Sequence, residues 1–192
     1  MSHEKFDLSK LEKLNDVGRF ETLSPDAMWA ALGSPVDAKS IVEIGAGTGL
    51  FAAQFALRAP AATLFAVDIE ETMLAWMRDN RPEVASGRMF PVLAEESLVP
   101  LPDESADIVY MINLHHELAS PAKSYVDALR LLRVGGRFMV VDWAPGDSPR
   151  GPSQHIRVAA EDVAKILTSV GFRKVIVHDG VLPYAWLVTA SR

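Results

Sequence analysis

The sequence predicts an α/β protein whose mostly parallel sheet is covered by helices on both faces. Short apolar runs that suit buried strands alternate along the chain with longer segments of helical periodicity. The chain has 192 residues, 49% of them hydrophobic, which suits one domain with a sizeable core. No internal repeat or low-complexity segment divides it, so we expect a single domain over residues 1–192.

Two helices are expected before the sheet, in a helical segment over residues 1–35. Ser9 begins a capping box, in which its side chain would cap the helix that follows. An apolar stripe at helical spacing comes next, formed by Leu11, Leu14 and Val17. The second helix is expected to begin at Ser24, which is followed by proline, and to stop at Gly33.

The remaining elements alternate in type. Strands are expected near residues 41–44, 63–67, 88–93, 107–112, 136–142, 173–178 and 184–190. Helices are expected near 49–59, 70–80, 121–132 and 161–170. The last helix carries acidic residues in its first turn, apolar residues on one face and Gly171 past its end, which are the usual signals of helix start, packing and stop.

The run from Ile41 to Leu50, IVEIGAGTGL, leads a strand through an acidic residue and three glycines into a helix. Glycine has no Cβ, so a ligand can approach this backbone closely. Glu43 would repel a phosphate and attract a cationic or amine-bearing ligand. A dinucleotide-binding fingerprint would have glycine in place of Leu50. A plain strand–turn–helix corner and another kind of nucleotide site stay open as alternatives.

Two further acidic elements follow the turn. Asp68 ends the second expected strand, about 20 residues beyond the glycines, where α/β sites place a carboxylate on ribose hydroxyls. Asp68 also suits a cap for the helix that follows it. Glu95 and Glu96 precede a proline-containing loop that leads into the fourth strand. For these two the alternative is a solvated acidic loop.

These elements resemble the motifs of the class I S-adenosylmethionine (SAM)-dependent methyltransferases. Within that class the chain resembles the ubiquinone/menaquinone-biosynthesis-methyltransferase-like (methyltransferase type 11) family, and it looks like a compact member whose substrate is unassigned. The resemblance implies a Rossmann-like three-layer sandwich with strand order 3-2-1-4-5-7-6 and strand seven antiparallel. It implies SAM as cofactor and S-adenosylhomocysteine as product. The cofactor-binding residues it implies are Glu43, Gly45, Ala46, Gly47, Gly49, Asp68, Ile69, Glu95, Glu96 and Asn113.

Within that set, the resemblance assigns the adenine contacts to Ile69 and to the pair Glu95 and Glu96. Ile69 matches the position that packs on the adenine ring in the family. The family more often has aspartate and then a small residue where this chain has Glu95 and Glu96. Which of these two carboxylates meets adenine therefore stays open.

Polar clusters follow the fourth and fifth strands, at the sheet edge where open α/β sheets bind ligands. His115 and His116 are candidate general bases, because an ordinary pKa near 6.5 suits proton removal at neutral pH. A histidine at this place faces the substrate in the resembling family, and structural roles are the alternative. Asp142 ends the fifth strand and is also a candidate catalytic residue. The candidate substrate-binding residues in the loop beyond it are Trp143, His155 and Arg157, the last two with loop anchoring as the alternative.

Composition excludes several classes of function. The net charge of −6 and the pI near 5.4 argue against a nucleic-acid partner. No apolar run approaches the ~20 residues of a membrane span, and the first residues lack an apolar signal region, so we expect a cytoplasmic protein. Without cysteine there is no zinc–thiolate site and no thiol nucleophile. The histidine spacing does not suit metal ligation, so no metal is expected.

We therefore expect a SAM-dependent methyltransferase that acts on a small-molecule acceptor. One alternative is a SAM- or nucleotide-binding protein without transferase activity. The other is an NAD(P)-dependent reductase, which Leu50 in the glycine turn disfavours. The acceptor, the methylated atom, the need for a base and the oligomeric state do not follow from the sequence, because a fold does not determine its substrate.

Overall fold

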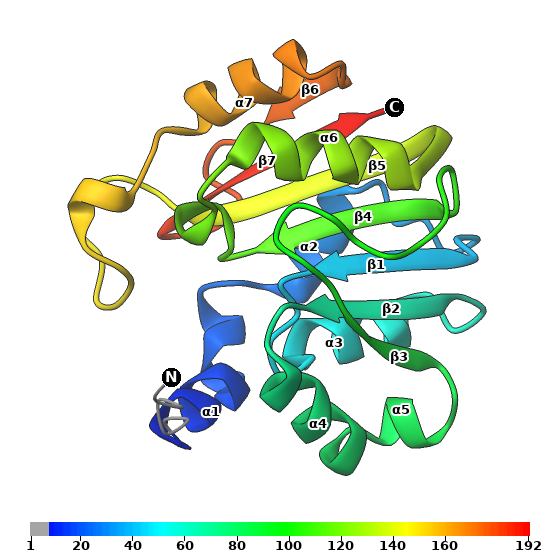
Figure 1. Cartoon of the computed structure of the whole chain (residues 1–192). Coiled ribbons are helices and arrows are strands. Elements are labelled where there is room, and N and C mark those ends of the chain that lie inside the picture. The colour runs from blue at the N-terminus through cyan, green and yellow to red at the C-terminus, as the bar shows by residue number, and fades with distance from the viewer. Residues whose placement is uncertain (1–7) are drawn as a thin grey trace.

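The structure, a computed structural model, describes residues 8–192 and the side chains of residues 11–192. In this part of the chain seven strands form one sheet in the order β3-β2-β1-β4-β5-β7-β6 (Figure 1). The strands are β1 (Ser40–Ile44), β2 (Thr63–Asp68), β3 (Met89–Leu93), β4 (Ala106–Ile112), β5 (Leu132–Trp143), β6 (Arg173–Val177) and β7 (Ala185–Ser191). Strand β7 runs antiparallel to both of its neighbours, and the other pairs are parallel. The expected order and direction of the strands are confirmed.

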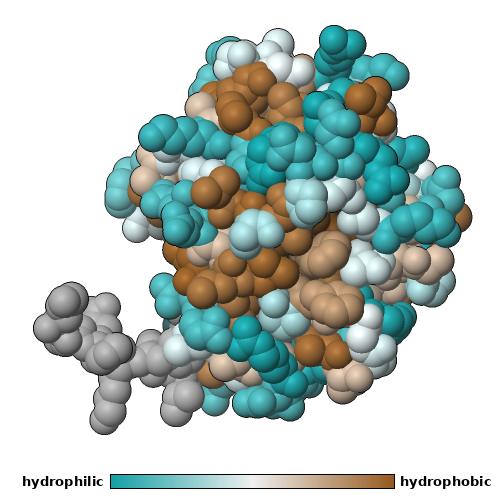
Figure 2. All heavy atoms as spheres, turned by 45° about the vertical axis from the view of Figure 1, so that its right-hand side comes forward, coloured by the Kyte–Doolittle hydropathy of each residue, from teal (hydrophilic) through white to brown (hydrophobic). Residues whose placement is uncertain are grey.

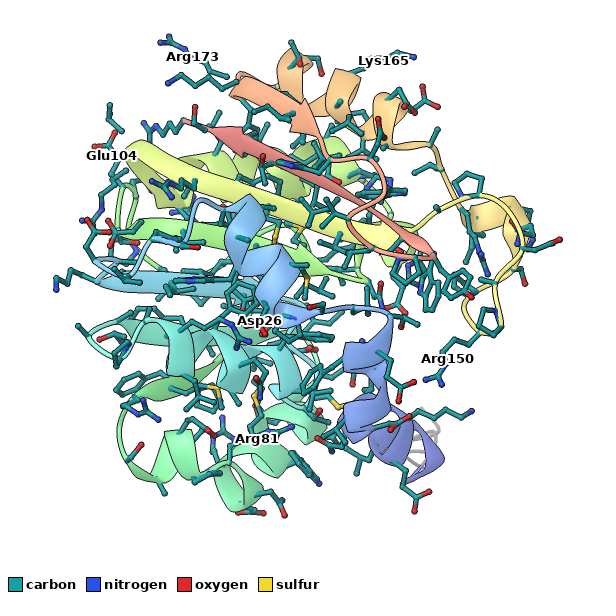
Figure 3. All side chains as sticks on the ribbon, turned by 180° about the vertical axis from the view of Figure 1, so that it is seen from behind. Asp26, Arg81, Glu104, Arg150, Lys165 and Arg173 are labelled. Carbon is teal, nitrogen blue, oxygen red and sulfur yellow. The ribbon has the colours of Figure 1, made fainter. Side chains whose placement is uncertain are left out.

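Helices cover the two faces of this sheet. The α-helices are α1 (Leu8–Asn15), α2 (Pro25–Ala31), α3 (Leu50–Arg58), α4 (Glu71–Asn80), α5 (Pro82–Ala85), α6 (Pro121–Leu131) and α7 (Ala160–Ser169). Short 3₁₀ helices are η1 (Val17–Glu21), η2 (His115–Glu117) and η3 (Gln154–Ile156). Helices α2, α3 and α4 bury their apolar side chains against one face, and α6 and α7 against the other (Figures 1 and 3). The three-layer arrangement is therefore as expected.

The N-terminal segment departs from the expected helix pattern in two respects. Helix α1 ends at Asn15, and the side chain of Asp16 accepts a hydrogen bond from Gly18 N at 2.8 Å to begin η1. Val17 is therefore not part of the apolar stripe: its side chain is 67% exposed. Helix α1 includes Ser9, so Ser9 is not the residue that precedes and caps the helix, and the predicted capping box is wrong in this position. The second helix begins at its predicted Ser24 cap.

The boundary between α6 and β5 also differs from the prediction. The helix stops at Leu131 and the strand begins at Leu132, four residues earlier than expected. Leu132 pairs with Ala106, and the register then shifts before Arg137 pairs with Ile108. Gly135 and Gly136 lie in this stretch, where they accommodate an irregular extension of the strand.

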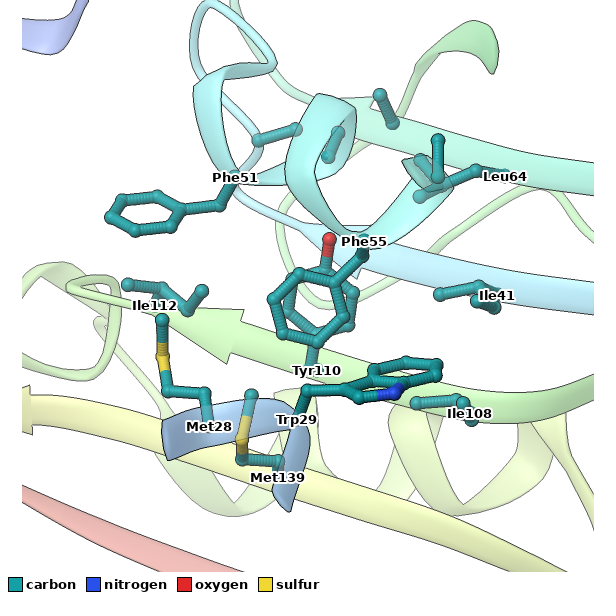
Figure 4. Packing of buried hydrophobic residues seen from close by; sticks show 14 of the residues in the cluster. Met28, Trp29, Ile41, Phe51, Phe55, Leu64, Ile108, Tyr110, Ile112 and Met139 are labelled. Atoms are coloured by element: carbon teal, nitrogen blue, oxygen red, sulfur yellow. The ribbon is translucent and has the colours of Figure 1, made fainter. Parts of the chain in front are cut away.

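The core on the α2–α3 side centres on aromatic packing. Phe55 of α3 stacks on Tyr110 of β4 with ring centroids 4.3 Å apart, and Trp29 of α2 meets Phe55 edge-on at 5.5 Å (Figure 4). Phe55 and Tyr110 are fully buried and Trp29 is nearly so. Such pairs stabilise a core beyond the area that they bury. This cluster holds α3, and with it the glycine turn before α3, against the sheet.

The carboxyl ends of β1, β2, β4 and β5 lie at one edge of the sheet. Helix α1, η1 and the loop after β5 extend beyond that edge, on the left of Figure 1. One face of the molecule is mostly hydrophilic with an apolar area near its middle (Figure 2). None of the helices within residues 8–192 is both long and apolar enough to cross a membrane.

The aromatic cluster yields a stability prediction. Phe55→Ala removes a fully buried ring and leaves a cavity, so we expect it to lower the free energy of unfolding by about 3–5 kcal/mol. Leu57→Ala on the same helix is the control, because Leu57 is 57% exposed and its loss should cost no more than ~0.5 kcal/mol. Urea unfolding of both variants measures the difference. Equal losses would mean that this cluster does not carry the packing of α3.

Candidate active site

A cavity of about 850 Å³ opens at the carboxyl-terminal edge of the sheet, within the range of small-molecule sites. Its walls come from the ends of β1, β2, β4 and β5, from α1 and η1, and from the loop after β5. The predicted site residues that line it are Glu43, Gly45, Ala46, Gly47, Asp68, Ile69, Glu95, Glu96, Asn113, His116 and Trp143. The predicted site residues that do not line it are Gly49, His115, Asp142, His155 and Arg157.

The glycine turn divides into a part that faces the cavity and a part that faces the core. Gly45 and Gly47 line the cavity with φ angles of +75° and +54°, which favour glycine. The backbone nitrogens of Gly45 and Ala46 both donate to Val67 O at 2.9 Å, which ties the turn to β2. Gly49 points the other way: a Cβ there would lie 2.8 Å from Met77 Sδ. Gly49 does not line the cavity, and its φ of +72° and the packing of α4 both favour glycine there.

Glu43 is the most buried charged group in the cavity wall. Its side chain is 2% exposed, and Tyr110 Oη donates a hydrogen bond to Glu43 Oε2 at 3.1 Å. Burial raises the pKa of Glu43 to about 8, against the opposing effects of the Tyr110 hydrogen bond and the charge of Arg19. Within residues 11–192 no lysine, arginine or histidine forms an ion pair with it.

Arg19 of η1 faces the same end of the cavity, and the sequence analysis did not assign it to the site. Its Nη1 donates to Leu14 O at 3.1 Å, and its guanidinium lies 4.9 Å from the centre of the Phe51 ring. Burial lowers the pKa of Arg19, while Glu43 and Asp16 oppose that shift. A lone arginine before the sheet carries no sequence signal for this role, because only the folded chain brings η1 to the end of β1.

Asp68 connects the glycine turn to the start of α4. Its Oδ2 accepts a hydrogen bond from Gly47 N at 2.6 Å, and its Oδ1 accepts one from Glu70 N at 3.0 Å. The second contact lies before α4, whose N-cap is Glu70 without a side-chain cap hydrogen bond, so Asp68 does not cap that helix. A carboxylate has about four acceptor positions, so Asp68 keeps capacity for ligand hydroxyls in the cavity that it lines. Ile69, which follows it, is 57% exposed on the cavity side.

The loop after β3 forms another wall of the cavity. Glu95 and Glu96 are both exposed, and Glu96 Oε1 accepts a hydrogen bond from Ala119 N at 3.2 Å. The buried Asp127 of α6 holds this loop: its Oδ2 accepts from Val99 N at 2.8 Å and its Oδ1 from Arg130 Nε at 2.7 Å. Both glutamates line the cavity, so the geometry leaves both available to a ligand.

His116 and Asp142 form a hydrogen-bonded pair on the opposite side of the cavity. His116 Nδ1 lies 2.8 Å from Asp142 Oδ1, and Asp142 also accepts from the backbone nitrogens of His116 and Trp143 at 3.0 and 2.7 Å. Burial alone would lower the pKa of His116, but the hydrogen bond and charge of Asp142 raise it above its ordinary value. The buried Asp142, which is 2% exposed, accepts a hydrogen bond from Nδ1 of His116. Nε2 of His116 is therefore the ring nitrogen that can take up a proton.

His115 lies in the core and not in the cavity. It is 6% exposed, its Nδ1 lies 2.6 Å from Tyr125 Oη, and its ring meets Trp186 edge-on with centroids 5.8 Å apart. Burial lowers the pKa of His115. The two adjacent histidines therefore have different surroundings: of this pair, His116 is the one that can meet a ligand.

Two buried oxygens at the cavity have no hydrogen-bond partner in the described part of the chain. They are Thr48 Oγ1 and Asn113 Oδ1, and both residues line the cavity. Asn113 has a φ of +55°, a left-handed conformation that asparagine tolerates better than most residues. Buried polar atoms are usually paired, so unpaired acceptors suit a ligand that carries hydrogen-bond donors.

Arg157 organises the loop after β5 from outside the cavity. It donates to the carbonyl oxygens of Pro152, Ala144 and Gly146 at 2.9–3.2 Å, and its guanidinium lies 5.5 Å from the centre of the Trp143 ring. Arg157 therefore anchors its loop, as the alternative to substrate binding supposed. The acceptors are backbone carbonyl groups and not a carboxylate. Trp143 lines the cavity and His155 is exposed beyond it. Arg150, on this loop, extends toward α1 and η1 and lies 3.5 Å from Asp16 (Figure 3).

No group of three or more His, Asp or Glu side chains suited to a metal ion was found in the part of the chain that the structure describes. His115 and His116 point to different surroundings, which separates the two residues that the sequence places side by side.

Comparison with known proteins identifies the family. The profile of the "Methyltransferase domain" family matches residues 42–140, which run from β1 to β5. The chain belongs to this family. The match includes the glycine turn, Asp68 and His116, and confirms the resemblance to class I SAM-dependent methyltransferases.

Individual proteins agree with this assignment. The chain is 31% identical over 147 residues to the ubiquinone/menaquinone biosynthesis C-methyltransferase of Dinoroseobacter shibae, covering 73% of this chain and 57% of that protein. It is 32% identical over 98 residues to the malonyl-[acyl-carrier protein] O-methyltransferase of Methylococcus capsulatus, covering 51% of this chain and 35% of that protein. The chain thus spans about half the length, or less, of these curated relatives.

A solved structure covers almost the whole chain. The SAM-dependent methyltransferase from Aquifex aeolicus superposes with a TM-score of 0.87 and 26% identity, over 97% of this chain and 98% of that one. The shared architecture extends beyond the family match to the N-terminal helices and to β6 and β7, because these elements lie outside residues 42–140.

The burial of Glu43 yields a pH-dependent stability prediction. The pKa is about 8 in the folded chain against an ordinary 4.5, so folding stability is lost as pH rises between these values, where only the unfolded chain releases the proton. Glu43→Gln has no such proton, so the variant should be more stable than the wild type at pH 8. We expect the difference to exceed its value at pH 5 by ~1 kcal/mol or more, about 2–4 °C in Tm. Thermal unfolding at both pH values measures this, and a difference independent of pH would contradict it.

Proposed function

We propose that this protein is a SAM-dependent methyltransferase that acts on a small-molecule acceptor. One observation carries the proposal: a single cavity joins the family's cofactor motifs at one end to the His116–Asp142 pair at the other. A pure binding protein has no need of a histidine oriented by a buried carboxylate at that place. The net charge of −6 supports a small molecule over a nucleic acid as acceptor.

The residues of the cavity fit the parts of SAM. Glu43 offers carboxyl oxygens to the ammonium of its amino-acid end, and Arg19 offers a positive charge to the carboxylate of that end. Asp68 offers acceptors to the ribose hydroxyls, and Ile69 offers an apolar surface to adenine, beside Glu95 and Glu96. The unpaired oxygens of Thr48 and Asn113 can accept further donors. Gly45, Ala46 and Gly47 allow the ligand close to the backbone.

The chain's own part in the reaction is to position, to exclude water and to accept a proton. When bound, SAM supplies a sulfonium methyl group that is already activated for in-line displacement. The cavity walls would position the acceptor relative to that methyl group and would limit its contact with water. His116 Nε2 takes the proton from the acceptor, while Asp142 holds Nδ1–H and stabilises the imidazolium that forms. Trp143 lies next to Asp142 and forms the wall on the acceptor side.

The names of the two relatives differ in the atom that is methylated. One is named as a C-methyltransferase of quinone biosynthesis and the other as an O-methyltransferase of a malonyl group on a carrier protein. A phenolic hydroxyl or an acidic ring carbon carries a proton that His116 can remove, whereas a carboxylate is already ionised at neutral pH and needs no base. We therefore propose an acceptor that loses a proton during transfer.

The cofactor assignment is tested by calorimetry with S-adenosylhomocysteine, with NADH as control. We expect S-adenosylhomocysteine to bind and NADH not to bind. Asp68→Ala should weaken the binding by about 1–3 kcal/mol, because it removes charged hydrogen bonds. Unchanged affinity in that variant would remove the ribose role of Asp68. Binding of NADH alone would overturn the methyltransferase proposal.

The base is tested once a screen of metabolites with isotopically labelled methyl-SAM has found an acceptor. His116→Ala should lower kcat by about 10²–10⁴-fold and leave the affinity for S-adenosylhomocysteine nearly unchanged. Activity should rise with pH through the pKa of His116, because the neutral ring is the active form. Asp142→Asn removes the charge that raises this pKa, so the rise should move to lower pH. His115→Ala is the comparison variant, because His115 does not line the cavity. Equal losses of kcat and of cofactor affinity in His116→Ala would indicate that His116 has a structural role.

A further inference from the structure

We propose that Glu43 carries a proton in the free protein and releases it when the amino-acid end of the cofactor binds, so that this carboxyl group distinguishes SAM and S-adenosylhomocysteine from nucleosides that lack that end. The inference rests on the proposed function, since it concerns the same cavity. It adds a proton to the binding equilibrium and gives Glu43 a role in ligand selection.

The position of Glu43 favours the neutral acid. It lies on β1 directly beside Tyr110 of β4, its register partner, and both side chains are buried. The Tyr110 hydroxyl donates to Oε2 at 3.1 Å. A carboxylate that is removed from water is stable only with an ion-pair partner or several donors, and otherwise it binds a proton. Burial raises the pKa of Glu43 to about 8, which also favours the protonated form.

The charged groups that face Glu43 already have other partners. Arg19 of η1 donates to Leu14 O at 3.1 Å. Arg81, after α4, donates to Thr48 O at 2.7 Å and to Asn15 Oδ1 at 2.5 Å. Asp68 of β2 adds a negative charge on the same side, which disfavours a second carboxylate. The backbone of Ala52 on α3 and the Tyr110 hydroxyl both favour the ionised form of Glu43, but neither carries a charge.

The amino-acid end of the cofactor supplies the cation that this arrangement lacks. An α-amino group has an ordinary pKa of about 7.7–8.0, so it enters as an ammonium at pH 6.5. The ammonium donates to the Glu43 carboxylate, and the Glu43 O–H bond breaks, so that one proton leaves to the solvent for each ligand bound. The ligand's carboxylate lies toward Arg19, which keeps the charges of this end balanced.

Affinity then depends on pH in a way that differs between ligands. While Glu43 is protonated, each unit of pH below its pKa makes proton release tenfold harder. The Kd of S-adenosylhomocysteine should therefore fall about tenfold between pH 6 and pH 7. 5′-Methylthioadenosine has the adenine, the ribose and the sulfur without the amino-acid end. It leaves the Glu43 proton in place, so its Kd should change little over this range.

The test is titration calorimetry of the full chain at pH 6.5 in phosphate and in imidazole, two buffers with different ionisation enthalpies. The difference in observed heat counts the protons released. We expect close to one proton for S-adenosylhomocysteine and close to none for 5′-methylthioadenosine. Equal proton release with both ligands, or none with S-adenosylhomocysteine, would overturn the inference and leave the cofactor assignment standing. If neither ligand binds, the proposed function itself is wrong.

Two variants assign the proton to its residue. Glu43→Gln should abolish the proton release with S-adenosylhomocysteine while its affinity for 5′-methylthioadenosine stays within about twofold of the wild type. Tyr110→Phe keeps the carboxyl group and removes the hydrogen bond that favours the ionised form, so its proton release should stay near one. Proton release that persists in Glu43→Gln would assign the proton to another group, such as His116, and overturn the proposal. Should Glu43→Gln fail to fold, the wild type decides: a Kd for S-adenosylhomocysteine that does not fall between pH 6 and pH 7 would overturn the proposal.

Discussion

The parallel pairing of β1 with both β2 and β4 is the constraint on which the site depends. Parallel neighbours end at the same edge, so the pairing brings the residues that close each strand together although they are far apart in the chain. Glu43 lies beside Tyr110 and Asp68 lies next to the glycine turn for this reason. The strand order reverses at β1, and the connections on its two sides diverge there, which leaves the room that the cavity occupies.

The charged groups around this cavity are of two kinds: those that already have protein partners and those that are left to bind a ligand. Asp142 and Asp127 are buried and satisfied by protein donors: the first orients His116, and the second holds the loop after β3. The guanidinium of Arg157 donates hydrogen bonds to carbonyl groups of its own loop. Glu43 differs from these because it is as buried as Asp142 but has no ion-pair partner among the described residues. The groups already satisfied shape the cavity, and the unsatisfied one marks where a charged ligand end belongs.

Much of the site was predictable, because its residues lie in short local motifs. The local motifs lie at the carboxyl ends of apolar strands, which is the edge where open α/β sheets bind ligands: the turn from Gly45 to Gly47, Asp68 at the end of β2 and Asn113 after β4. Gly49 shows the limit of such motifs: it has the spacing of a cofactor contact but faces Met77 in the core. Arg19 shows the opposite limit, since nothing near it in the sequence indicates a site. His155 and Arg157, which were predicted to bind substrate, lie apart from the strand ends and do not line the cavity.

The sequence by itself determined the fold class, the order of the elements and the cofactor family, because apolar periodicity and the glycine turn are local properties of the chain. Only the tertiary structure decided which of two adjacent histidines meets the cavity. His115 and His116 have the same chemistry and nearly the same position, but the short η2 helix turns one toward Tyr125 and the other toward Asp142. The same holds for Arg19 and for the loop after β5. Their partners lie on other elements, and the direction of a side chain in space depends on packing between elements, which no local pattern records.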